Sequence, residues 1–247
     1  MRTNDNLVSG GLKIIAHRGF SGVAPENTLP AFQKALELGV DGIELDVHQS
    51  RDGKIIVIHD PTINRTTKGK GRVSDLDSGE ISSFGIPLLV DVLKLVDGKA
   101  TLYIEIKKGD SFYPEIEKNI LDLIEAHKAR SWCILHSFEK ETLIRIHQLD
   151  QKITLLQTLF VPALFSSLYF EKTFDKNPVS HFRSLEGINI NHTALNPSLV
   201  KKIHRSGMKI IAWTVNDPDN IRRMMKLGVN GIISNFPDRV KKIRDEK

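Results

Sequence analysis

The stretch LGVDGIELD at residues 38–46 returns near the other end of the chain as LGVNGIISN at residues 227–235. Each copy indicates the end of a helix, a glycine in the left-handed conformation, and then a buried strand. A second pair of segments, KIIAH at 13–17 and KIIAW at 209–213, repeats in the same way. Two distant parts of the chain therefore share the plan strand–helix–glycine–strand, which is the unit of a parallel sheet.

Short apolar segments that predict strands recur along the whole chain. They lie near residues 12–17, 41–48, 101–106, 132–136, 153–157, 186–191, 208–214 and 230–234. Segments with apolar residues at helical spacing, such as ENTLPAFQKALEL and PEIEKNILDLIEAHK, separate most of them. Parallel strands that alternate with helices over about 250 residues predict an α/β protein, a (β/α)8 TIM barrel. A doubly wound open sheet is the alternative, although no glycine-rich phosphate loop follows the first strand.

The chain has 247 residues, of which 40% are hydrophobic and 26% charged, and no Pro/Gly-rich linker divides it. We therefore expect a single domain over residues 1–247. Residues 49–100 depart from the repeating unit, with a predicted hairpin and then PTINRTTKGKGRVSDLDSGEI, so we expect a small insertion at about 60–100. Residues 158–185 also depart from it, because TLFVPALFSSLYF predicts a buried loop or short helix, or alternatively a lid facing an acyl chain.

The charged residues and the single cysteine limit the class of protein. The net charge of +5 is mild and its Lys and Arg residues are scattered, which favours a solvated surface over a nucleic-acid interface. Cys133 alone cannot form an internal disulfide and is compatible with a reducing compartment. No apolar run has signal-peptide length at the N-terminus or reaches the roughly 18 residues of a membrane span. We expect a cytoplasmic protein without stable membrane insertion, and a homodimer is among the oligomeric states left open.

Polar residues gather at the predicted strand ends, and TIM barrels place their active sites at the C-terminal ends of their strands. They are His17 and Arg18 on the first strand, Glu44 and Asp46 on the second, Glu105 and Lys107 on the third, and Trp213 on the seventh. Side chains alternate along a strand, so Glu44 and Asp46 project to one side, and Glu105 and Lys107 also share a side. We therefore expect these residues to line the mouth of the barrel.

The carboxylates of Glu44, Asp46 and Glu105 would repel one another there unless a cation lay among them. Oxygen ligands without cysteine favour Mg²⁺ or Ca²⁺ over zinc. Internal salt bridges to Arg18 and Lys107 are the alternative for any one of these carboxylates. For the three together we favour a metal site, because the excess negative charge lies where ligands bind.

The segment DGIELDVHQSRDGKIIVIHD at 41–60 predicts a hairpin that returns to the carboxylates. If Asp52-Gly53 is a two-residue turn, Asp46 faces His59, and a three-residue turn moves this pairing by one position. We therefore expect His59 to be a close neighbour of Asp46. We expect His48 to be peripheral.

His17 and His59 near a metal site suit a general base and a general acid. A cation together with Arg18 and Lys107 suits a phosphoryl group whose charge must be neutralised during displacement. Attack requires deprotonation of a nucleophile, and an alkoxide leaving group requires a proton. The pattern therefore predicts hydrolysis of a phosphodiester.

Six ordered pieces of the chain carry a family resemblance: AHRG at 16–19, PENT at 25–28, GIELDV at 42–47, HD at 59–60, YIEIK at 103–107 and AWTVN at 212–216. With GIISNFPD at 231–238 as the closing strand and turn, the chain resembles the glycerophosphodiester phosphodiesterase family over nearly its whole length. That family is related in architecture to phosphatidylinositol-specific phospholipase C. The resemblance implies a distorted TIM barrel with a small insertion after the HD motif.

The resemblance also implies a small-molecule phosphodiester substrate, with sn-glycerol 3-phosphate and an alcohol as products. It implies a divalent cation on Glu44, Asp46 and Glu105, acid/base roles for His17 and His59, phosphate contacts from Arg18 and Lys107, and packing of Trp213 against the glycerol end. The chain departs from the family pattern at His136, where we expect a small polar residue, and at Ser234-Asn235, where relatives often carry Thr-Asp.

Several alternatives stay open in the sequence. Glu26 and Asn27 support the site or bind substrate or metal, while Asn27 or Thr28 can instead cap the following helix. Asn189 and Asn191 line the barrel mouth or make core hydrogen bonds. The head group, the choice between Mg²⁺ and Ca²⁺, the identity of the base, and direct water attack against a cyclic phosphate are not fixed.

Other functions also remain compatible with the pattern. A lysophospholipase D-type hydrolase would use the same residues, and a non-hydrolytic sugar-phosphate-binding barrel could use Arg18 and Lys107 without needing His59. An isomerase or aldolase would place a Glu base or a Schiff-base Lys in the barrel. Lys107 is a poor Schiff-base former because a Lys between carboxylates stays protonated.

Overall fold

The structure is a computed structural model that describes residues 11–109, 111–162 and 178–246. Its strands form one sheet in the order β1-β9-β8-β7-β6-β5-β4-β2-β3, and β1 also pairs with β2, so the sheet closes on itself. The strands are β1 (Lys13–His17), β2 (Gly42–Gln49), β3 (Ile55–Val57), β4 (Thr101–Ile106), β5 (Cys133–Ser137), β6 (Thr154–Leu159), β7 (Leu185–Asn191), β8 (Lys209–Trp213) and β9 (Gly231–Ser234). All pairings except that of β3 are parallel. The predicted TIM barrel is confirmed, and its strands begin and end within two residues of the predicted positions.

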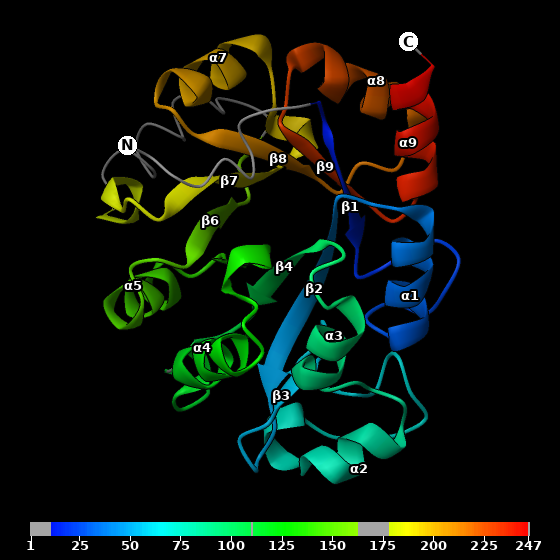
Figure 1. The fold of residues 1–247 in the computed structure, drawn as a ribbon, viewed down its shortest axis with the longest axis vertical. Helices are drawn as coiled ribbons and strands as arrows, with labels where there is room; N and C mark the ends of the chain where they lie inside the picture. Colours follow the sequence, from blue (N-terminus) through cyan, green and yellow to red (C-terminus); the bar gives the residue numbers. More distant parts are fainter. Residues whose placement is uncertain (1–10, 110, 163–177, 247) are drawn as a thin grey trace.

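The helices lie around the outside of the barrel (Figure 1). The α-helices among the described residues are α1 (Leu29–Leu38), α2 (Ser78–Ser83), α3 (Leu89–Val96), α4 (Ile116–Ala126), α5 (Lys140–Leu149), α7 (Pro197–Arg205), α8 (Pro218–Leu227) and α9 (Pro237–Asp245). Short 3₁₀ turns are η1 (Val73–Asp75), η2 (Arg130–Trp132), η3 (Pro178–His181) and η4 (His192–Ala194). Most barrel strands are therefore joined by a helix that packs back on the sheet, as the right-handed β–α–β unit requires.

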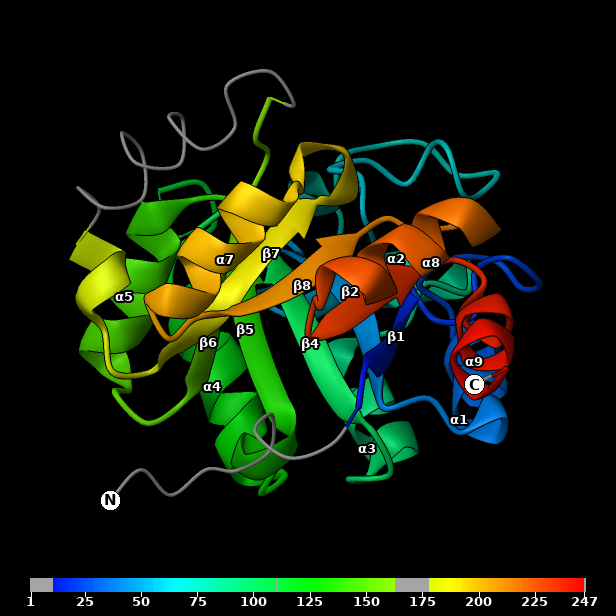
Figure 2. The same cartoon turned by 90° about the horizontal axis from the view of Figure 1, so that it is seen from above.

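The repeated LGV(D/N)GI segments have the predicted local structure. Helix α1 ends at Gly39 with φ 71°, and α8 ends at Gly228 with φ 77°, and a buried strand follows each. Helices α1 and α9 lie side by side although they come from opposite ends of the chain (Figures 1 and 2). The Lys241 ammonium in α9 donates to the carbonyl of Leu38 at 2.7 Å. These contacts cover the seam at which β9 meets β1.

Side-chain alternation gives the barrel strands two different faces. On β2, Ile43, Leu45 and Val47 are fully buried in the large apolar core between barrel and helices. The barrel interior holds a separate apolar layer that consists of Ile15, Tyr103, Ile134, Leu156, Ile211 and Ile233. This layer fills the interior, and polar side chains follow it toward the C-terminal ends of the strands.

The chain between β3 and β4 leaves the barrel before it returns. Helix α2 lies away from the barrel at the lower edge of Figure 1. This excursion has a small apolar cluster of its own, composed of Ile56, Ile58, Ile63, Val73, Ile81 and Ile86. Helix α3 instead packs beside α1 and belongs to the main core. The division of residues 1–247 into one domain with an insertion at about 60–100 stays a prediction.

The hairpin between β2 and β3 has a three-residue loop, which is one of the two turn lengths that the sequence left open. Val47 pairs with Val57, and Gln49 pairs with Ile55. The amide of Ser50 donates to the carbonyl of Lys54, and Gly53 has φ 76°. The left-handed conformation of Gly53 is typical of the three-residue loop, which shifts the strand pairing by one position.

Two further expectations concern the segment TLFVPALFSSLYF and membrane-spanning helices. Most of TLFVPALFSSLYF falls within residues 163–177, so the predicted loop or lid lies outside the described residues. Within residues 11–109, 111–162 and 178–246, no helix is long and apolar enough to cross a lipid bilayer.

Candidate active site

Three buried carboxylates meet inside the barrel, at the C-terminal ends of β2 and β4. One oxygen from each of Glu44, Asp46 and Glu105 lies within 4.8 Å of the other two. The parallel register sets Asp46 beside Glu105, and Glu44 shares their inward face two residues earlier. The structure thus brings together the three residues that the sequence predicts as metal ligands.

Two cationic side chains contact this carboxylate cluster. Arg18 Nε lies 3.3 Å from Asp46 Oδ2, and Lys107 Nζ lies 3.2 Å from Asp46 Oδ1. Lys107 also lies 2.6 Å from Glu105, and Asn27 donates to Asp46 at 2.8 Å. Although burial opposes the effect, Lys107 and Arg18 lower the pKa of Asp46 to about 2. Asp46 is therefore the carboxylate that stays ionised.

Glu44 has no Lys or Arg side chain within ion-pair distance among the described residues. Its carboxylate accepts from the backbone amide of Arg18 at 3.1 Å and lies 3.8 Å from His17 Nε2. Burial raises the pKa of Glu44 well above its usual range, and Asp46 and Glu105 raise it further. Burial and Asp46 also raise the pKa of Glu105. Burial and mutual repulsion thus disfavour ionisation of all three carboxylates together, and their oxygen donors fit a hard divalent cation that would relieve this repulsion.

His17 lies at the end of β1 and is held from behind by an amide. Its Nδ1 lies 2.5 Å from Asn235 Oδ1 at the end of β9, and its Nε2 faces Glu44. Burial, and then the charge of Arg18, lower the pKa of His17 to about 4. With Nδ1–H donating to Asn235, the Nε2 lone pair of a neutral imidazole points toward the cluster.

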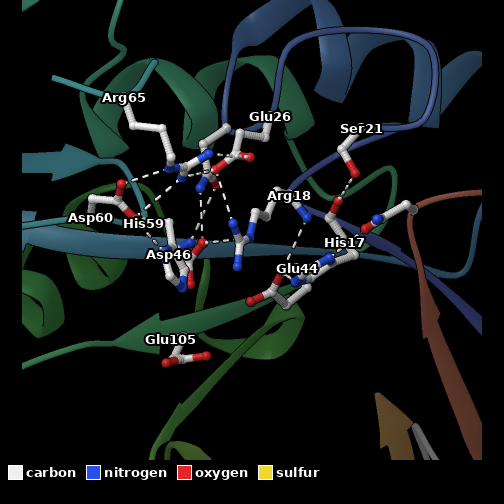
Figure 3. A network of polar contacts seen from close by, with 12 residues as sticks. His17, Arg18, Ser21, Glu26, Glu44, Asp46, His59, Asp60, Arg65 and Glu105 are labelled. Atoms are coloured by element: carbon white, nitrogen blue, oxygen red, sulfur yellow. Dashed lines mark hydrogen bonds and ion pairs between the residues drawn. The ribbon is translucent and has the colours of Figure 1, made fainter. Parts of the chain in front are cut away.

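His59 is held by a carboxylate in place of an amide (Figure 3). Its Nδ1 lies 2.7 Å from Asp60 Oδ1. Hydrogen bonds from Arg65 lower the pKa of Asp60 to about 2, so its carboxylate is ionised beside the imidazole. The three-residue loop shifts the pairing by one position, and the amide of Ile58 donates to the carbonyl of Asp46. The His59 side chain still lines the same cavity as Glu44, Glu105 and His17.

Glu26 joins the loop after β1 to the segment after β3. It accepts from Arg18 at 2.9 Å and from Arg65 at 2.6 Å, while Arg65 also pairs with Asp60 at 2.6 Å. Arg65 is the first contributor to the lowered pKa of Glu26. This chain of ion pairs connects Asp60, which contacts His59, to Arg18 (Figure 3). Arg65 was not predicted from the sequence, because its contact with Glu26 forms only in the folded structure.

The loop that carries Arg18, Glu26 and Asn27 is held tightly against α1. Arg18 and Asn27 have φ of 57° and 55°, and Thr28 caps α1 by accepting from the Ala31 amide. Gly19 is required between them, since a Cβ there would lie 2.7 Å from the backbone of Ala31. Thr28 is thus the helix cap, and Asn27 instead contacts Asp46.

His48 is buried, so the expectation that it is peripheral is wrong. Its Nδ1 lies 2.8 Å from the Tyr113 hydroxyl, and its Nε2 lies 3.0 Å from the carbonyl of His59. Strand alternation gives the reason, because residue 48 shares the face of Asp46. This imidazole ties the backbone of His59 to the loop before α4.

A cavity of about 170 Å³ opens above the carboxylates. Arg18, Lys107 and both histidines line one side of it, and Trp213 on β8 lines another. Phe138 and Phe160 pack near Trp213, with ring centroids 5.7 and 6.4 Å from it. A larger hollow of about 850 Å³ lies outside the barrel between α7 and α8 and contains none of these residues. The candidate catalytic and phosphate-binding side chains therefore surround the smaller cavity.

The sequence model of the glycerophosphoryl diester phosphodiesterase family matches residues 17–239. The chain belongs to this family. It is 37% identical over 249 residues to a glycerophosphodiester phosphodiesterase of Bacillus altitudinis. The alignment covers 95% of this chain and 98% of that protein. The chain is 35% identical to a glycerophosphodiester phosphodiesterase of Caldanaerobacter subterraneus subsp. tengcongensis, covering 91% and 94%. The resemblance read from the sequence is confirmed, as is the prediction of an enzyme of the phosphodiesterase class.

Solved structures share the fold of this family member. A putative glycerophosphoryl diester phosphodiesterase of Silicibacter pomeroyi DSS-3 has a TM-score of 0.84 at 22% identity, covering 98% of this chain and 97% of that chain. An Oleispira antarctica phosphodiesterase in complex with the product sn-glycerol-3-phosphate has a TM-score of 0.80 at 24% identity, covering 94% and 96%. At these identities the likeness supports the barrel fold alone.

The two departures from the family pattern both lie in the site. Asn235 holds His17 as described above. His136 lies inside the barrel on β5, where its Nδ1 is 3.0 Å from the Thr158 hydroxyl. Burial lowers the pKa of His136 to about 3, and the charge of Asp46 and a hydrogen bond with the Tyr103 backbone offset this only in part, so the imidazole is neutral. The cavity is thus lined by a third histidine besides His17 and His59.

The two asparagines of β7 have different hydrogen-bond partners. The sequence left the roles of both open. Asn191 bonds to the backbone amide and carbonyl of Val161 and to Thr193. Asn189 is fully buried, and neither atom of its amide has a hydrogen-bond partner among the described residues. Asn191 therefore holds the loop after β6, while Asn189 lines the cavity.

Proposed function

We propose that this protein hydrolyses glycerophosphodiesters to sn-glycerol 3-phosphate and an alcohol, with a divalent cation and with His17 and His59 as the proton-transfer groups. The observation that supports it most strongly is the meeting of three buried carboxylates beside a cavity that two oriented histidines line. The family name and the names of the relatives agree with this substrate class.

Glu44, Asp46 and Glu105 would hold the cation, and their oxygen donors suit Mg²⁺ or Ca²⁺. A bound cation supplies neutralisation of the phosphoryl charge that develops during displacement. Arg18 and Lys107 lie beside the carboxylates and are the side chains that would contact and orient the phosphate. Glu26 and Asn27 would support the site, because Glu26 holds Arg18 and Asn27 holds Asp46.

The partners of the two histidines suggest different roles for them. His17 lies against the neutral amide of Asn235 in a buried position beside Arg18, which favours the unprotonated ring. His59 Nδ1 lies against the carboxylate of Asp60, whereas His17 Nδ1 lies against an amide oxygen. We assign His17 as the base that removes a proton from water or from a substrate hydroxyl. We assign His59 as the acid that donates a proton to the oxygen of the departing alcohol.

Chelation of divalent cations is expected to abolish the activity. After treatment with EDTA and removal of the chelator, release of sn-glycerol 3-phosphate from glycerophosphocholine should fall to background, and added Mg²⁺ or Ca²⁺ should restore it. A panel of diesters crossed with both metals would identify the preferred head group and ion. Full turnover in the presence of EDTA would remove the metal from the proposal, and absence of turnover with every diester and metal would remove the activity itself.

A lysophospholipase D-type activity is the second candidate, because the mouth of the cavity presents exposed aromatic side chains. Phe138 is 45% exposed and Phe160 is 64% exposed, and both lie near Trp213. An apolar chain could pack on these rings, as large exposed apolar groups next to a pocket often mark a binding surface.

Phe160→Ala separates the two candidates. If acyl chains pack on this ring, the variant should lose about tenfold in kcat/KM for lysophosphatidylcholine while glycerophosphocholine turnover stays within about twofold. Equal values for both substrates in both proteins would remove the lysophospholipid candidate. A sugar-phosphate-binding barrel without catalysis would hydrolyse neither. Location in the cytoplasm and a homodimeric state stay predictions.

A further inference from the structure

The cavity above the carboxylates has two chemically different sides. The side built from β1, β2 and β4 carries the charged groups already described. The opposite side carries His136, Thr158 and Asn189, from β5, β6 and β7, and we call these three residues the neutral wall. Strand pairing places them next to one another, since Thr158 pairs with Asn189 and the His136 ring bonds to Thr158.

The neutral wall has hydrogen-bonding atoms that the protein leaves unused. Both amide atoms of Asn189 and the Nε2 atom of His136 are buried without a hydrogen-bond partner among the described residues. The indole Nε1 of Trp213, which lines the same cavity from β8, is in the same situation. Buried polar atoms without partners destabilise a fold, so native proteins rarely keep them unless a ligand or water completes them. Here they come from three strands and line one cavity.

These atoms suit hydroxyl groups better than charged groups. An amide and a neutral imidazole both donate and accept, and so does an alcohol, whereas a phosphate would lie against the Arg18 and Lys107 side. The apolar layer around Tyr103 closes the barrel below, so this part of the cavity admits only a small group. The larger alcohol of the substrate would then lie at the open mouth of the cavity, beside Phe138 and Phe160.

We propose that the neutral wall binds the free hydroxyl groups of the glycerol portion of the substrate, with Asn189 and His136 as its hydrogen-bonding residues. This inference rests on the proposed function and adds to it the side chains that distinguish glycerol from other small alcohols. His136 is oriented by Thr158. Trp213 covers the carbon skeleton and offers its N–H to the same hydroxyl groups.

Two substrates that differ only in these hydroxyl groups test the inference. One is the p-nitrophenyl diester of sn-glycerol 3-phosphate, and the other is the p-nitrophenyl diester of propyl phosphate. The wild-type protein with metal should prefer the first by at least about tenfold in kcat/KM, since a site built to bond hydroxyls rejects an analogue that lacks them. Asn189→Leu should lose about tenfold or more with the glycerol diester and change less than about threefold with the propyl diester.

The stability of the metal-free protein provides a second measurement and a matched control. Asn189→Leu removes two unsatisfied polar atoms at similar volume, so its Tm should equal or exceed that of the wild type. Asn191→Leu, two residues further along the same strand, removes three made hydrogen bonds and should lower the Tm. His136→Phe repeats the substrate test from a different strand, should Asn189→Leu fail to fold.

Each outcome bears on one claim. Equal loss with both diesters, or no loss with either, in both the Asn189→Leu and His136→Phe proteins would overturn the neutral wall as the glycerol site. A wild-type protein that hydrolyses both diesters equally would do the same and would leave the proposed phosphodiesterase activity intact. Failure of the wild-type protein to hydrolyse either diester with any metal would instead count against the proposed function.

Discussion

His59→Ala is expected to lower kcat for glycerophosphocholine by about 10²–10⁴-fold, the usual contribution of a general acid or base. With a p-nitrophenyl leaving group the loss should shrink to less than about tenfold, because nitrophenolate departs without a proton. His17→Ala should lose activity to a similar extent with both substrates, because its proposed task is to deprotonate the nucleophile. Steady-state kinetics of the two variants on the two diesters measure this directly.

The control for these variants is His204→Ala, on an exposed position of α7 outside the cavity, which should turn over as the wild type does. Calorimetric titration should show that neither active-site variant weakens metal binding by more than a few-fold. If the nitrophenyl diester rescues His17→Ala in place of His59→Ala, the assignments of acid and base must be exchanged. If either variant hydrolyses glycerophosphocholine normally, the acid/base pair is wrong.

Glu44→Gln is expected to lower kcat by about 10³-fold, because charge neutralisation at the phosphoryl group is worth several kcal/mol. The wild-type Tm should rise on addition of Mg²⁺ or Ca²⁺, since a ligand that binds the folded state stabilises it. In the variant this rise should be absent or much smaller. The metal-free variant should be at least as stable as the metal-free wild type, because the pKa of Glu44 shows that burial and neighbouring carboxylates disfavour its charge.

Asp122→Asn is the matched control, since it removes an exposed carboxylate whose partner is Lys118 on the same helix. It should leave both the kinetics and the metal-dependent rise in Tm unchanged. A Glu44→Gln protein with undiminished turnover and an undiminished response to metal would show that Glu44 is not a ligand. Thermal unfolding with and without metal and activity are separate measurements, so loss of one does not imply loss of the other.

Most of the fold could be predicted from the sequence, because it depends on local patterns. The glycines Gly39 and Gly228 mark helix ends, and the apolar alternation around Glu44 and Asp46 assigns opposite faces to neighbouring residues. These features depend on near neighbours in the chain and need no knowledge of the rest. The carboxylate cluster follows from these patterns, because neighbouring parallel strands bring their C-terminal ends to the same edge of the barrel.

The hairpin shows where local reasoning became incomplete. The turn signal at Asp52-Gly53 is correct, but one residue of loop length alters every pairing, and two- and three-residue loops share the same sequence signal. His48 was misjudged for a related reason. Its position on the inward face was readable, but its burial comes from Tyr113, which lies in a loop 65 residues further along the chain.

The sequence by itself determined the barrel, the family, and the set of residues that meet at the ends of β1, β2 and β4, because strand periodicity and short motifs encode them directly. The tertiary structure alone decided how each of these residues is partnered. Asn235 behind His17, Glu26 beside Arg65, and the unpartnered Asn189 opposite them come from segments distant in the chain, whereas Asp60 directly follows the His59 that it holds. Partners of this kind set protonation and leave some polar atoms for a ligand, and no local pattern records them because they exist only once the barrel has closed.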